Sequence, residues 1–468
     1  MGGCTRSPRG RTIAGLRDAA AGSSVVVCVL DAARVDHLGC CGYPRETTPN
    51  IDRLASESLV FEQHFTQASF TKPSTASLFT SQYPDTHLVL TNVRNRGIAD
   101  SSFTMARGLG AAGFQTGFFS SNPWVDVKKG MGRNFHDAYG LDEAGEVQEE
   151  GGERFAPEPL LELFRGWLPE HVDERFFVYL HFMPPHTPYR QPEEYTSLFR
   201  GTTPPGYLAE KYRPGQYDVP IGDESRKHPP LPRWINLYDA NLRYGDWVVG
   251  EVESMLREAG VLENTLLVVT SDHGEAFGEH GYVLHGGPVH DEVSHIPFLL
   301  RFPGGGQTGR ISALTQTVDV LPTVFELLDI KVADEVQGRS LLPVMTGGAE
   351  EVNEFVFTRA KPDPSCPDDR AKYMVRSRSH ALLLYSNGRW RALYDLNADP
   401  EQRHNVIDSQ PAVTREMVEV FREFAMQQGT PPLSFVGIES EAPVVEDLPR
   451  PERTPQLERE PRALGYLQ

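Results

Sequence analysis

The chain has no long hydrophobic run, and this limits the classes of protein to which it can belong. No apolar stretch approaches the roughly 20 residues that a helix needs to span a bilayer. The longest candidate, Val25 to Leu30, has the length of a strand. The first residues include several basic ones but no apolar segment behind them, so they do not form a secretory signal. We therefore expect no stable membrane insertion and a cytoplasmic location.

Cysteine and positive charge are also scarce. The 468 residues include five cysteines, an odd number without metal-type spacing, which favours a reduced protein. There are 45 Lys and Arg against 64 Asp and Glu, a net charge of -19. Because no basic excess offsets repulsion from phosphates, we expect no nucleic-acid partner. A small anionic ligand in a locally positive pocket stays compatible with this charge.

The chain does contain a regular alternation of buried strands and helices. Apolar strand patterns occur at "VVVCVL", "FQTGFFSSN", "RFFVYLHFM", "NTLLVVT" and "HIPFLLRF". Helical patterns separate them, among them a long one from Leu237 to Ala259 that ends at Gly260. This alternation predicts an α/β protein, a three-layer α/β/α sandwich around a mainly parallel central sheet.

The C-terminal part of the chain has a different pattern. Short strands without long helices between them precede one helix, Ala412 to Met426, which predicts a small α+β domain. The composition divides the chain into a flexible lead-in over 1–22, a large domain over 23–348, a sheet-plus-helix subdomain over 349–428, and a Pro- and Glu-rich tail over 429–468 that is expected to be disordered.

Polar side chains follow three of the buried strands. Asp31 follows the first strand, His186 the second, and Asp272 and His273 the third. Ligands of open α/β sheets bind beyond the carboxyl ends of the strands, so we expect these residues at one edge. Each has a structural alternative: a helix cap for Asp31, a loop histidine for His186, and a turn for Asp272 and His273. His181, inside its strand, is predicted to be structural.

Thr71 begins the segment "TKPSTASLFT" and has two interpretations. Threonine is a good helix N-cap, and Pro73 suits the first turn of a helix. The same place suits a nucleophile, because a helix N-terminus stabilises an alkoxide and binds an anionic group. A threonine hydroxyl is a poor nucleophile near neutral pH unless a divalent cation lowers its pKa. Both interpretations stay open from these residues alone.

The order of these motifs resembles the sulfatase family of the alkaline-phosphatase superfamily. The chain has an aspartate after the first strand, a nucleophile-x-Pro-Ser helix, a "PHTPY" loop and "SDHGE", together with "GCCGYPRETTPNIDRLASESLVF" and "ALYDLNADPEQRHNV". The resemblance covers about Val25 to Asn405. It implies an alkaline-phosphatase-like α/β/α catalytic domain over 23–348 and a small C-terminal sheet domain.

The resemblance also implies roles for single residues. Asp31, Asp272 and His273 match the metal-ligand positions of the family. Thr71 matches the nucleophile, which also touches the metal. Two further histidines match positions that contact the bound ester or protonate the leaving group, namely His186 and His285.

Three departures from the family pattern change this expectation. The family carries Cys or Ser at the position of Thr71 and converts it to formylglycine, whereas the β-carbon of threonine carries a methyl group and cannot give that aldehyde. No formylglycine is therefore expected. Ala32 stands where many members have a second aspartate. A lysine segment is replaced by "FFSSNPW", in which Asn122 is the candidate substitute for substrate binding. The remaining nitrogen and oxygen ligands favour one Mn²⁺ or Zn²⁺ ion, with Ca²⁺ as an alternative.

These residues predict a metal-dependent ester hydrolase. Unmodified threonine is similar to the nucleophile of phosphodiesterase and phosphonate-type relatives, which favours a phosphate-type ester: a phosphodiester, a phosphomonoester or a phosphonate ester. A sulfuric ester hydrolase without formylglycine and a non-catalytic binding protein are the alternatives. The expected substrate is a small-molecule, saccharide-derived or lipid-derived anionic ester. Its alcohol half is expected to be selected by the loops Asp142–Ala156 and Thr202–Trp234, and the oligomeric state is not predicted.

Overall fold

The computed structural model describes residues 11–91, 97–127, 130–140, 156–205, 231–280, 283–287, 289–360, 372–385 and 390–428. Residues 1–10, most of the two loops predicted to select the substrate, and the predicted tail over 429–468 lie outside these ranges. The expectations for those segments stay predictions.

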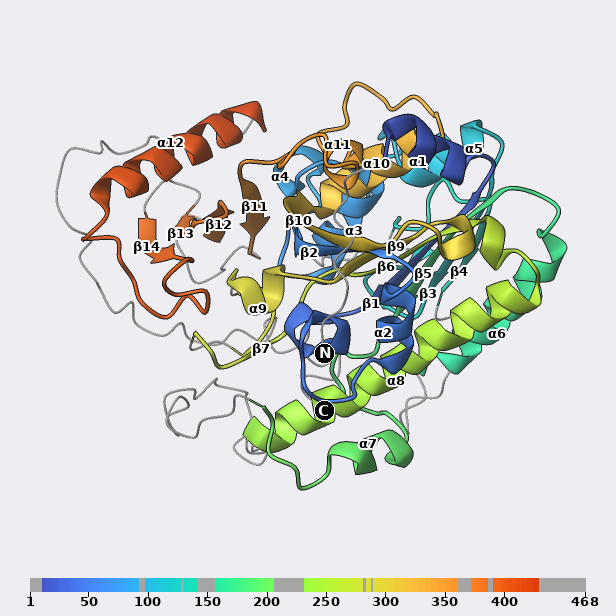
Figure 1. The fold of residues 1–468 in the computed structure, drawn as a ribbon, viewed down its shortest axis with the longest axis horizontal. Coiled ribbons are helices and arrows are strands. Elements are labelled where there is room, and N and C mark those ends of the chain that lie inside the picture. Colours follow the sequence, from blue (N-terminus) through green and yellow to red (C-terminus); the bar gives the residue numbers. More distant parts are fainter. Residues whose placement is uncertain are drawn as a thin grey trace.

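An eight-stranded sheet forms the centre of the molecule (Figure 1). Neighbouring strands are parallel except β9, which runs antiparallel to β2 and β6. The prediction of a mainly parallel sheet is therefore confirmed. In spatial order the strands are β10 (Gly309–Gln316), β2 (Leu59–Phe65), β9 (Phe298–Arg301), β6 (Thr265–Ser271), β1 (Ser24–Leu30), β5 (Phe176–Phe182), β3 (Gln115–Ser120) and β4 (Asp137–Tyr139).

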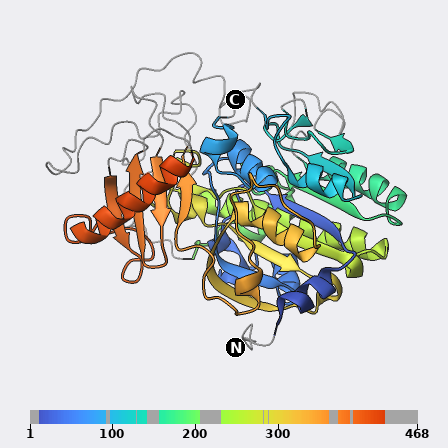
Figure 2. The same cartoon turned by 90° about the horizontal axis from the view of Figure 1, so that it is seen from above.

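Helices cover both faces of this sheet (Figures 1 and 2). Along β1, Val25, Val27 and Val29 join one apolar cluster, while Val26, Cys28 and Leu30 join another. The first cluster includes residues of α1 (Ile13–Ala20), α3 (Thr71–Thr80), α5 (Met105–Ala111), α10 (Val320–Leu327) and α11 (Leu342–Met345). The second includes residues of α2 (Pro49–Ala55), α6 (Glu158–Trp167) and α8 (Leu231–Glu258). Because side chains alternate along a strand, the apolar run of β1 is buried on both sides, as in a three-layer sandwich.

Two helices differ from the sequence-based expectation. Residues 13–20, within the predicted flexible lead-in, form α1, because Leu16 and Ala20 are one helical turn apart and both are buried. Thr12 caps this helix by accepting a hydrogen bond from the backbone N–H of Gly15. The helix α8 begins at Leu231, earlier than predicted. Within the described ranges, none of the helices, α8 included, is both long enough and apolar enough to cross a membrane.

A second, smaller sheet lies beside the first and is antiparallel (Figure 1). Its strands are β11 (Val356–Arg359), β12 (Lys372–Arg376), β13 (His380–Tyr385) and β14 (Trp390–Asp395), and α12 (Pro411–Gln427) packs on it through Phe421 and Phe424. These elements lie within the predicted subdomain. The edge strand β11 is hydrogen-bonded to the segment before α3, since the N–H of Arg359 donates to Gln67 O and that of Ser69 to Arg359 O. The small sheet thereby supports the approach to α3.

Short elements complete the described structure. They are the helices α4 (Pro84–His87), α7 (Glu193–Phe199) and α9 (Asp291–Ser294), and the hairpin strands β7 (Ala276–Phe277) and β8 (Val283–Leu284).

Asp319, at the start of α10, makes stability dependent on pH. Its buried carboxylate accepts hydrogen bonds from the backbone N–H groups of Gln316 and Arg339 and from Asn353 Nδ2. Burial raises the pKa of Asp319 to about 7. The folded state then holds this proton more tightly than the unfolded chain does. The stability that the proton on Asp319 contributes is therefore complete below about pH 4 and is lost as pH rises through about 7. As pH rises from 4 to 8, we expect Asp319 to lower the free energy of unfolding by roughly 4 kcal/mol.

Urea unfolding of the wild type and of Asp319→Asn at both pH values measures this effect. The variant should lose that part of the pH dependence, because asparagine does not titrate. Equal pH dependence in the two proteins would contradict the assignment.

Candidate active site

The register of three parallel strands brings the predicted site residues together. Leu30 at the end of β1 pairs with Phe182 of β5 on one side and with Ser271 of β6 on the other. Asp31 and Asp272 each directly follow these positions, so both carboxylates lie at the carboxyl edge of the sheet, as expected. Both are buried.

Each of the two carboxylates keeps one oxygen without a hydrogen-bond partner. Asp272 Oδ1 accepts from the backbone N–H groups of Ala32 (3.1 Å) and His273 (2.9 Å), whereas its Oδ2 has no partner. Asp31 Oδ2 accepts from Asn122 Nδ2, whereas its Oδ1 has none. Burial opposes ionisation of Asp31, but His186, His181 and His273 hold the pKa of Asp31 well below its ordinary value. Two free carboxylate oxygens in a buried place need a positive partner.

His273 directs one ring nitrogen at these oxygens. Its Nδ1 is 2.9 Å from Gly274 O, which can only accept, so Nδ1 carries the hydrogen and Nε2 has the lone pair in the neutral ring. Nε2 lies 3.4 Å from Asp272 Oδ2 and 3.5 Å from Asp31 Oδ1. Burial alone would lower the pKa of His273, but Asp272 and Asp31 outweigh it and raise that pKa. The site therefore stabilises positive charge at this position.

Thr71 is the first residue of α3 and does not cap it. The N-cap position belongs to Phe70, whose side chain makes no capping bond, so the helix-cap interpretation of Thr71 is wrong. The buried Thr71 hydroxyl lies 3.1 Å from His273 Nε2, to which it can donate. The hydroxyl thus lies at a helix N-terminus and beside the free carboxylate oxygens.

His186 and His285 lie beside His273. Ring centroids are 4.2 Å apart for His273 and His285, and 4.9 Å apart for His186 and His285. The Nδ1–H of His186 donates to Thr187 O, and burial lowers the pKa of His186. His285 Nδ1 is 3.1 Å from Oε1 of Glu275, and burial raises the pKa of Glu275 to about 7. This buried Glu275 was not predicted, although it directly continues the "SDHGE" motif.

A small cavity opens beside His186. It is lined by apolar residues, by His186 itself and by three further polar residues, Arg190, Asn241 and Tyr244. Arg190 is exposed and places a cation at this opening. The cavity offers space for part of a ligand next to the histidines.

Asn122 is held by several protein groups. Its Nδ2 donates to Asp31, and its Oδ1 accepts from the backbone N–H groups of Trp124 (2.6 Å) and Val125 (3.2 Å). These bonds fix the amide in place and let it position the Asp31 carboxylate, while the expected contact with substrate stays a prediction.

His181 was predicted to be structural, but its side chain reaches the site. Its Nε2 lies 3.3 Å from Asp31 Oδ2 and 4.0 Å from Asp272 Oδ2. One ligand atom from each of Asp31, His181 and Asp272 lies within 4.8 Å of the others. The orphaned oxygens and the imidazole nitrogens beside them fit a divalent cation with mixed oxygen and nitrogen ligands. Side chains alternate along β5, so His181 could have been placed on the side of the sheet that faces Asp31 if the register of β5 with β1 had been known.

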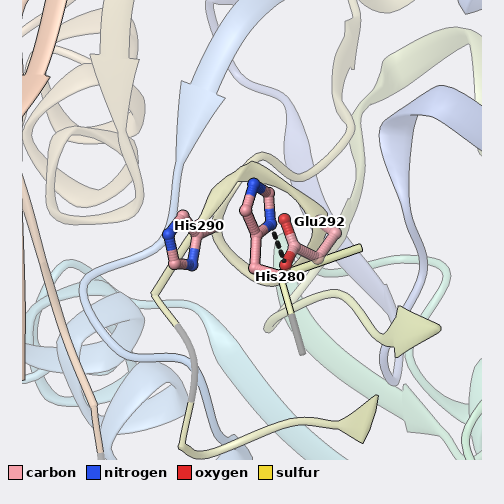
Figure 3. Close-up of side chains that lie close together, drawn as sticks. All are labelled: His280, His290 and Glu292. Carbon is pink, nitrogen blue, oxygen red and sulfur yellow. Dashed lines mark hydrogen bonds and ion pairs between the residues drawn. The ribbon is translucent and has the colours of Figure 1, made fainter. Parts of the chain in front are cut away.

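A second group of ligand-type side chains, His280, His290 and Glu292, belongs to different contacts (Figure 3). His280 Nε2 lies within 3.1 Å of the carbonyl oxygens of Glu401 and Gln402, so its Nδ1 faces Glu292 at 2.9 Å. Burial opposes protonation of His280, but Glu292 outweighs it and raises the pKa of His280. His280 thus joins the loop after β7 to α9 through Glu292 and to the segment after β14 through the two carbonyl oxygens.

Comparisons with known proteins agree with this geometry. The sequence profile described as Sulfatase matches residues 23–330, more than half of the chain. A second profile, described as N-sulphoglucosamine sulphohydrolase, C-terminal, matches residues 278–427. The two profiles together cover the large domain and the small sheet.

Two sulfatase sequences and one solved structure are similar to this chain. Arylsulfatase K of Gallus gallus is 31% identical over 187 residues, which are 38% of this chain and 34% of that protein, so the chain spans about a third of this relative. The uncharacterised sulfatase YidJ of Escherichia coli (strain K12) is 25% identical over 431 residues, 81% of this chain and 82% of that protein. The crystal structure of phosphonate monoester hydrolase of Agrobacterium radiobacter shares the fold, with a TM-score of 0.74 at 21% identity over 87% of this chain and 96% of that chain.

The matched profile includes the strand before Asp31, the helix of Thr71 and the strand before Asp272, which are the elements that build the site. The chain belongs to the sulfatase family of ester hydrolases.

Proposed function

We propose that this protein is a metal-dependent hydrolase of a phosphate-type ester, with Thr71 as nucleophile. The observation that carries the proposal is the Thr71 hydroxyl, held 3.1 Å from His273 Nε2 at the N-terminus of α3. A hydroxyl in this buried place lies beside the atoms that would hold a cation, and at a helix terminus that favours the negative charge it develops.

The residue type at this position argues for phosphorus. The β-carbon of threonine carries a methyl group and a single oxygen, so it cannot become the aldehyde of formylglycine. Thr71 Oγ1 instead loses its proton and forms a bond to phosphorus, while the bond from phosphorus to the leaving oxygen breaks and that oxygen takes up a proton. Water then attacks phosphorus and gives up a proton, the Thr71–phosphorus bond breaks, and Thr71 Oγ1 takes up a proton so that the hydroxyl is restored.

The proposed metal ligands are Asp31, Asp272, His273 and Thr71. A divalent cation there would lower the pKa of the Thr71 hydroxyl and offset the negative charge of the ester. The protein's part is to hold these ligands in place: Asn122 fixes Asp31, and the Gly274 carbonyl fixes the tautomer of His273. The mixed nitrogen and oxygen set favours Mn²⁺ or Zn²⁺ over Ca²⁺.

His186 and His285 take the positions next to the ester. His285, paired with Glu275, is the better proton source for the leaving oxygen, because burial lowers the pKa of His186 and keeps it neutral. The neutral His186 contacts the ester. The cavity that Arg190 lines beside His186 accommodates part of the anionic substrate.

A sulfuric ester hydrolase is the second candidate, and the C-terminal match to N-sulphoglucosamine sulphohydrolase favours it. The two candidates differ in which aryl ester is cleaved faster. With purified protein and added Mn²⁺ or Zn²⁺, we expect a nitrophenyl phosphate monoester, diester or phosphonate ester to be cleaved at least about tenfold faster than nitrophenyl sulfate in kcat/KM. Faster cleavage of the sulfate would favour the second candidate. Absence of turnover on every ester would favour the remaining alternative, a non-catalytic binding protein.

The role of His285 predicts a dependence on the leaving group. With His285→Gln, kcat/KM for an alkyl ester should fall by about 10² to 10⁴, because an alkoxide leaves poorly without a proton. The nitrophenyl ester should lose less than about tenfold, since nitrophenolate needs no proton. Equal losses on both esters would assign His285 to binding instead. His280→Gln is the matched control, because His280 is engaged with Glu292.

A further inference from the structure

His181 is the imidazole in this site whose role the sequence leaves unassigned. It lies in β5, every residue of which is buried, and its side chain is fully inaccessible. A polar ring in such a strand needs partners at both nitrogens. Nδ1 lies 2.7 Å from the hydroxyl of Tyr179, and Nε2 is directed at the two aspartates.

The distances around this place match a coordination shell. Ligands about 2.0 to 2.1 Å from a tetrahedral ion are separated from one another by about 3.3 to 3.4 Å. His273 Nε2 lies 3.4 Å from Asp272 Oδ2 and 3.5 Å from Asp31 Oδ1. His181 Nε2 lies 4.0 Å from Asp272 Oδ2, within a small adjustment of the same spacing. The two oxygens named here are the ones that have no hydrogen-bond partner.

Tyr179 prepares His181 for this role. The hydroxyl oxygen of Tyr179 lies 2.7 Å from Nδ1 of His181 and can accept the Nδ1–H. In that tautomer the lone pair of Nε2 is directed at the aspartates, and a bound cation would take the place of the hydrogen that can otherwise join Nε2 to Asp31 Oδ2 at 3.3 Å. A hydrogen bond from the other ring nitrogen is the usual support of a metal-bound histidine.

Ala32 supplies the reason why an extra ligand is needed. It directly follows Asp31, where the family pattern has a second aspartate, and it has a left-handed φ of 63° that aspartate tolerates better than alanine. Its backbone N–H donates to Asp272 Oδ1.

We propose that His181 is a ligand of the divalent cation and takes the place of the carboxylate absent at Ala32. This inference rests on the proposed metal site and makes it more specific. Replacing a carboxylate by an imidazole lowers the negative charge of the ligand set and shifts its preference from Ca²⁺ toward Zn²⁺ or Mn²⁺. The site then has two imidazole ligands, His181 and His273.

Metal titration of the full-length, metal-stripped protein tests this inference without any substrate. Zn²⁺ and Ca²⁺ dissociation constants are measured by calorimetry for the wild type, His181→Gln, and the double variant Ala32→Asp/His181→Gln. We expect His181→Gln to raise the Zn²⁺ dissociation constant by at least about 100-fold and the Ca²⁺ dissociation constant by less than about tenfold. The double variant should bind Ca²⁺ more tightly than the wild type. Tyr179→Phe should weaken Zn²⁺ by about 10-fold or more while leaving the ligand in place.

Spectroscopy of the Co²⁺-loaded proteins reports the ligands directly. The visible absorption bands of bound Co²⁺ should differ from those of the wild type in His181→Gln, because an imidazole ligand has been lost. The double variant Ala32→Asp/His181→Gln should not restore the wild-type bands, because it replaces the imidazole by a carboxylate. Thermal unfolding in chelator checks that each variant is folded. Unchanged Zn²⁺ affinity and an unchanged Co²⁺ spectrum in folded His181→Gln would overturn this inference alone. A wild type that binds none of these ions would overturn it together with the proposed metal-dependent function.

Discussion

Thr71→Ala is expected to lower kcat/KM on the preferred ester by at least about 10⁴-fold, with a metal content equal to that of the wild type. The substitution removes the oxygen that forms the bond to phosphorus, and removing a nucleophile has effects of this size or larger in other hydrolases. Asp31, Asp272 and His273 remain, so the cation should still bind. Steady-state kinetics and elemental analysis of the same preparation give both quantities.

Thr71→Ser is the matched control, because serine keeps the hydroxyl and loses only a methyl group. It should retain turnover within about 100-fold of the wild type. Intact-protein mass spectrometry after rapid acid quench should show a phosphorylated species in the wild type and none in Thr71→Ala. Undiminished turnover by the alanine variant would rule out Thr71 as the nucleophile, whatever ester is used.

Removal of the divalent cation is the second change with a large expected effect. Turnover should fall by at least about 10³-fold after chelation and dialysis, because the ester's negative charge and the two buried aspartates then lose their counter-charge. Re-addition of Mn²⁺ or Zn²⁺ should restore turnover more fully than Ca²⁺ or Mg²⁺. The metal also stabilises the fold by linkage, by about 4 kcal/mol at a concentration 1,000 times its dissociation constant. Thermal unfolding with and without metal measures this second effect.

Asp272→Asn separates the metal effect from a general effect of the chelator. Asparagine keeps the oxygen that accepts from Ala32 and His273 but lacks the charge of the free Oδ2. This variant should unfold at the same temperature with and without metal. Metal-dependent stabilisation equal to that of the wild type would mean that the cation binds elsewhere, for example at His280, His290 and Glu292.

Several features of the site follow from local sequence. Asp31 and Asp272 each follow an apolar run, and such runs become buried strands wherever helices cover both faces of a sheet. Parallel strands end at the same edge, so the meeting of Asp31 with Asp272 could be predicted before any register was known. The helix of Thr71 could be predicted from its Pro73 and from the motif order that the family shares.

Other features were missed because they depend on which segments meet. Residues 13–20 looked like a flexible lead-in, but Leu16 and Ala20 find an apolar surface on the sheet and form a helix on it. The hydrogen bond from the Asn122 amide to Asp31 was not predicted, because it depends on the path of the chain after β3. One of the two interpretations of Thr71 was a helix cap, but α3 begins one residue earlier than that role requires.

His181 shows the difference between what sequence patterns determine and what tertiary structure determines. The sequence was sufficient for the family, the layered α/β fold and the place of Thr71 at the start of a helix, because strand length, apolar alternation and motif order are local properties. It could not assign His181, because an imidazole in an apolar strand has the same pattern whether it packs in the core or binds a cation. The pairing of β1 with β5 places this imidazole at the site. That register sets Asp31 beside a histidine 150 residues away, and such a contact depends on tertiary packing rather than on any pattern within one segment.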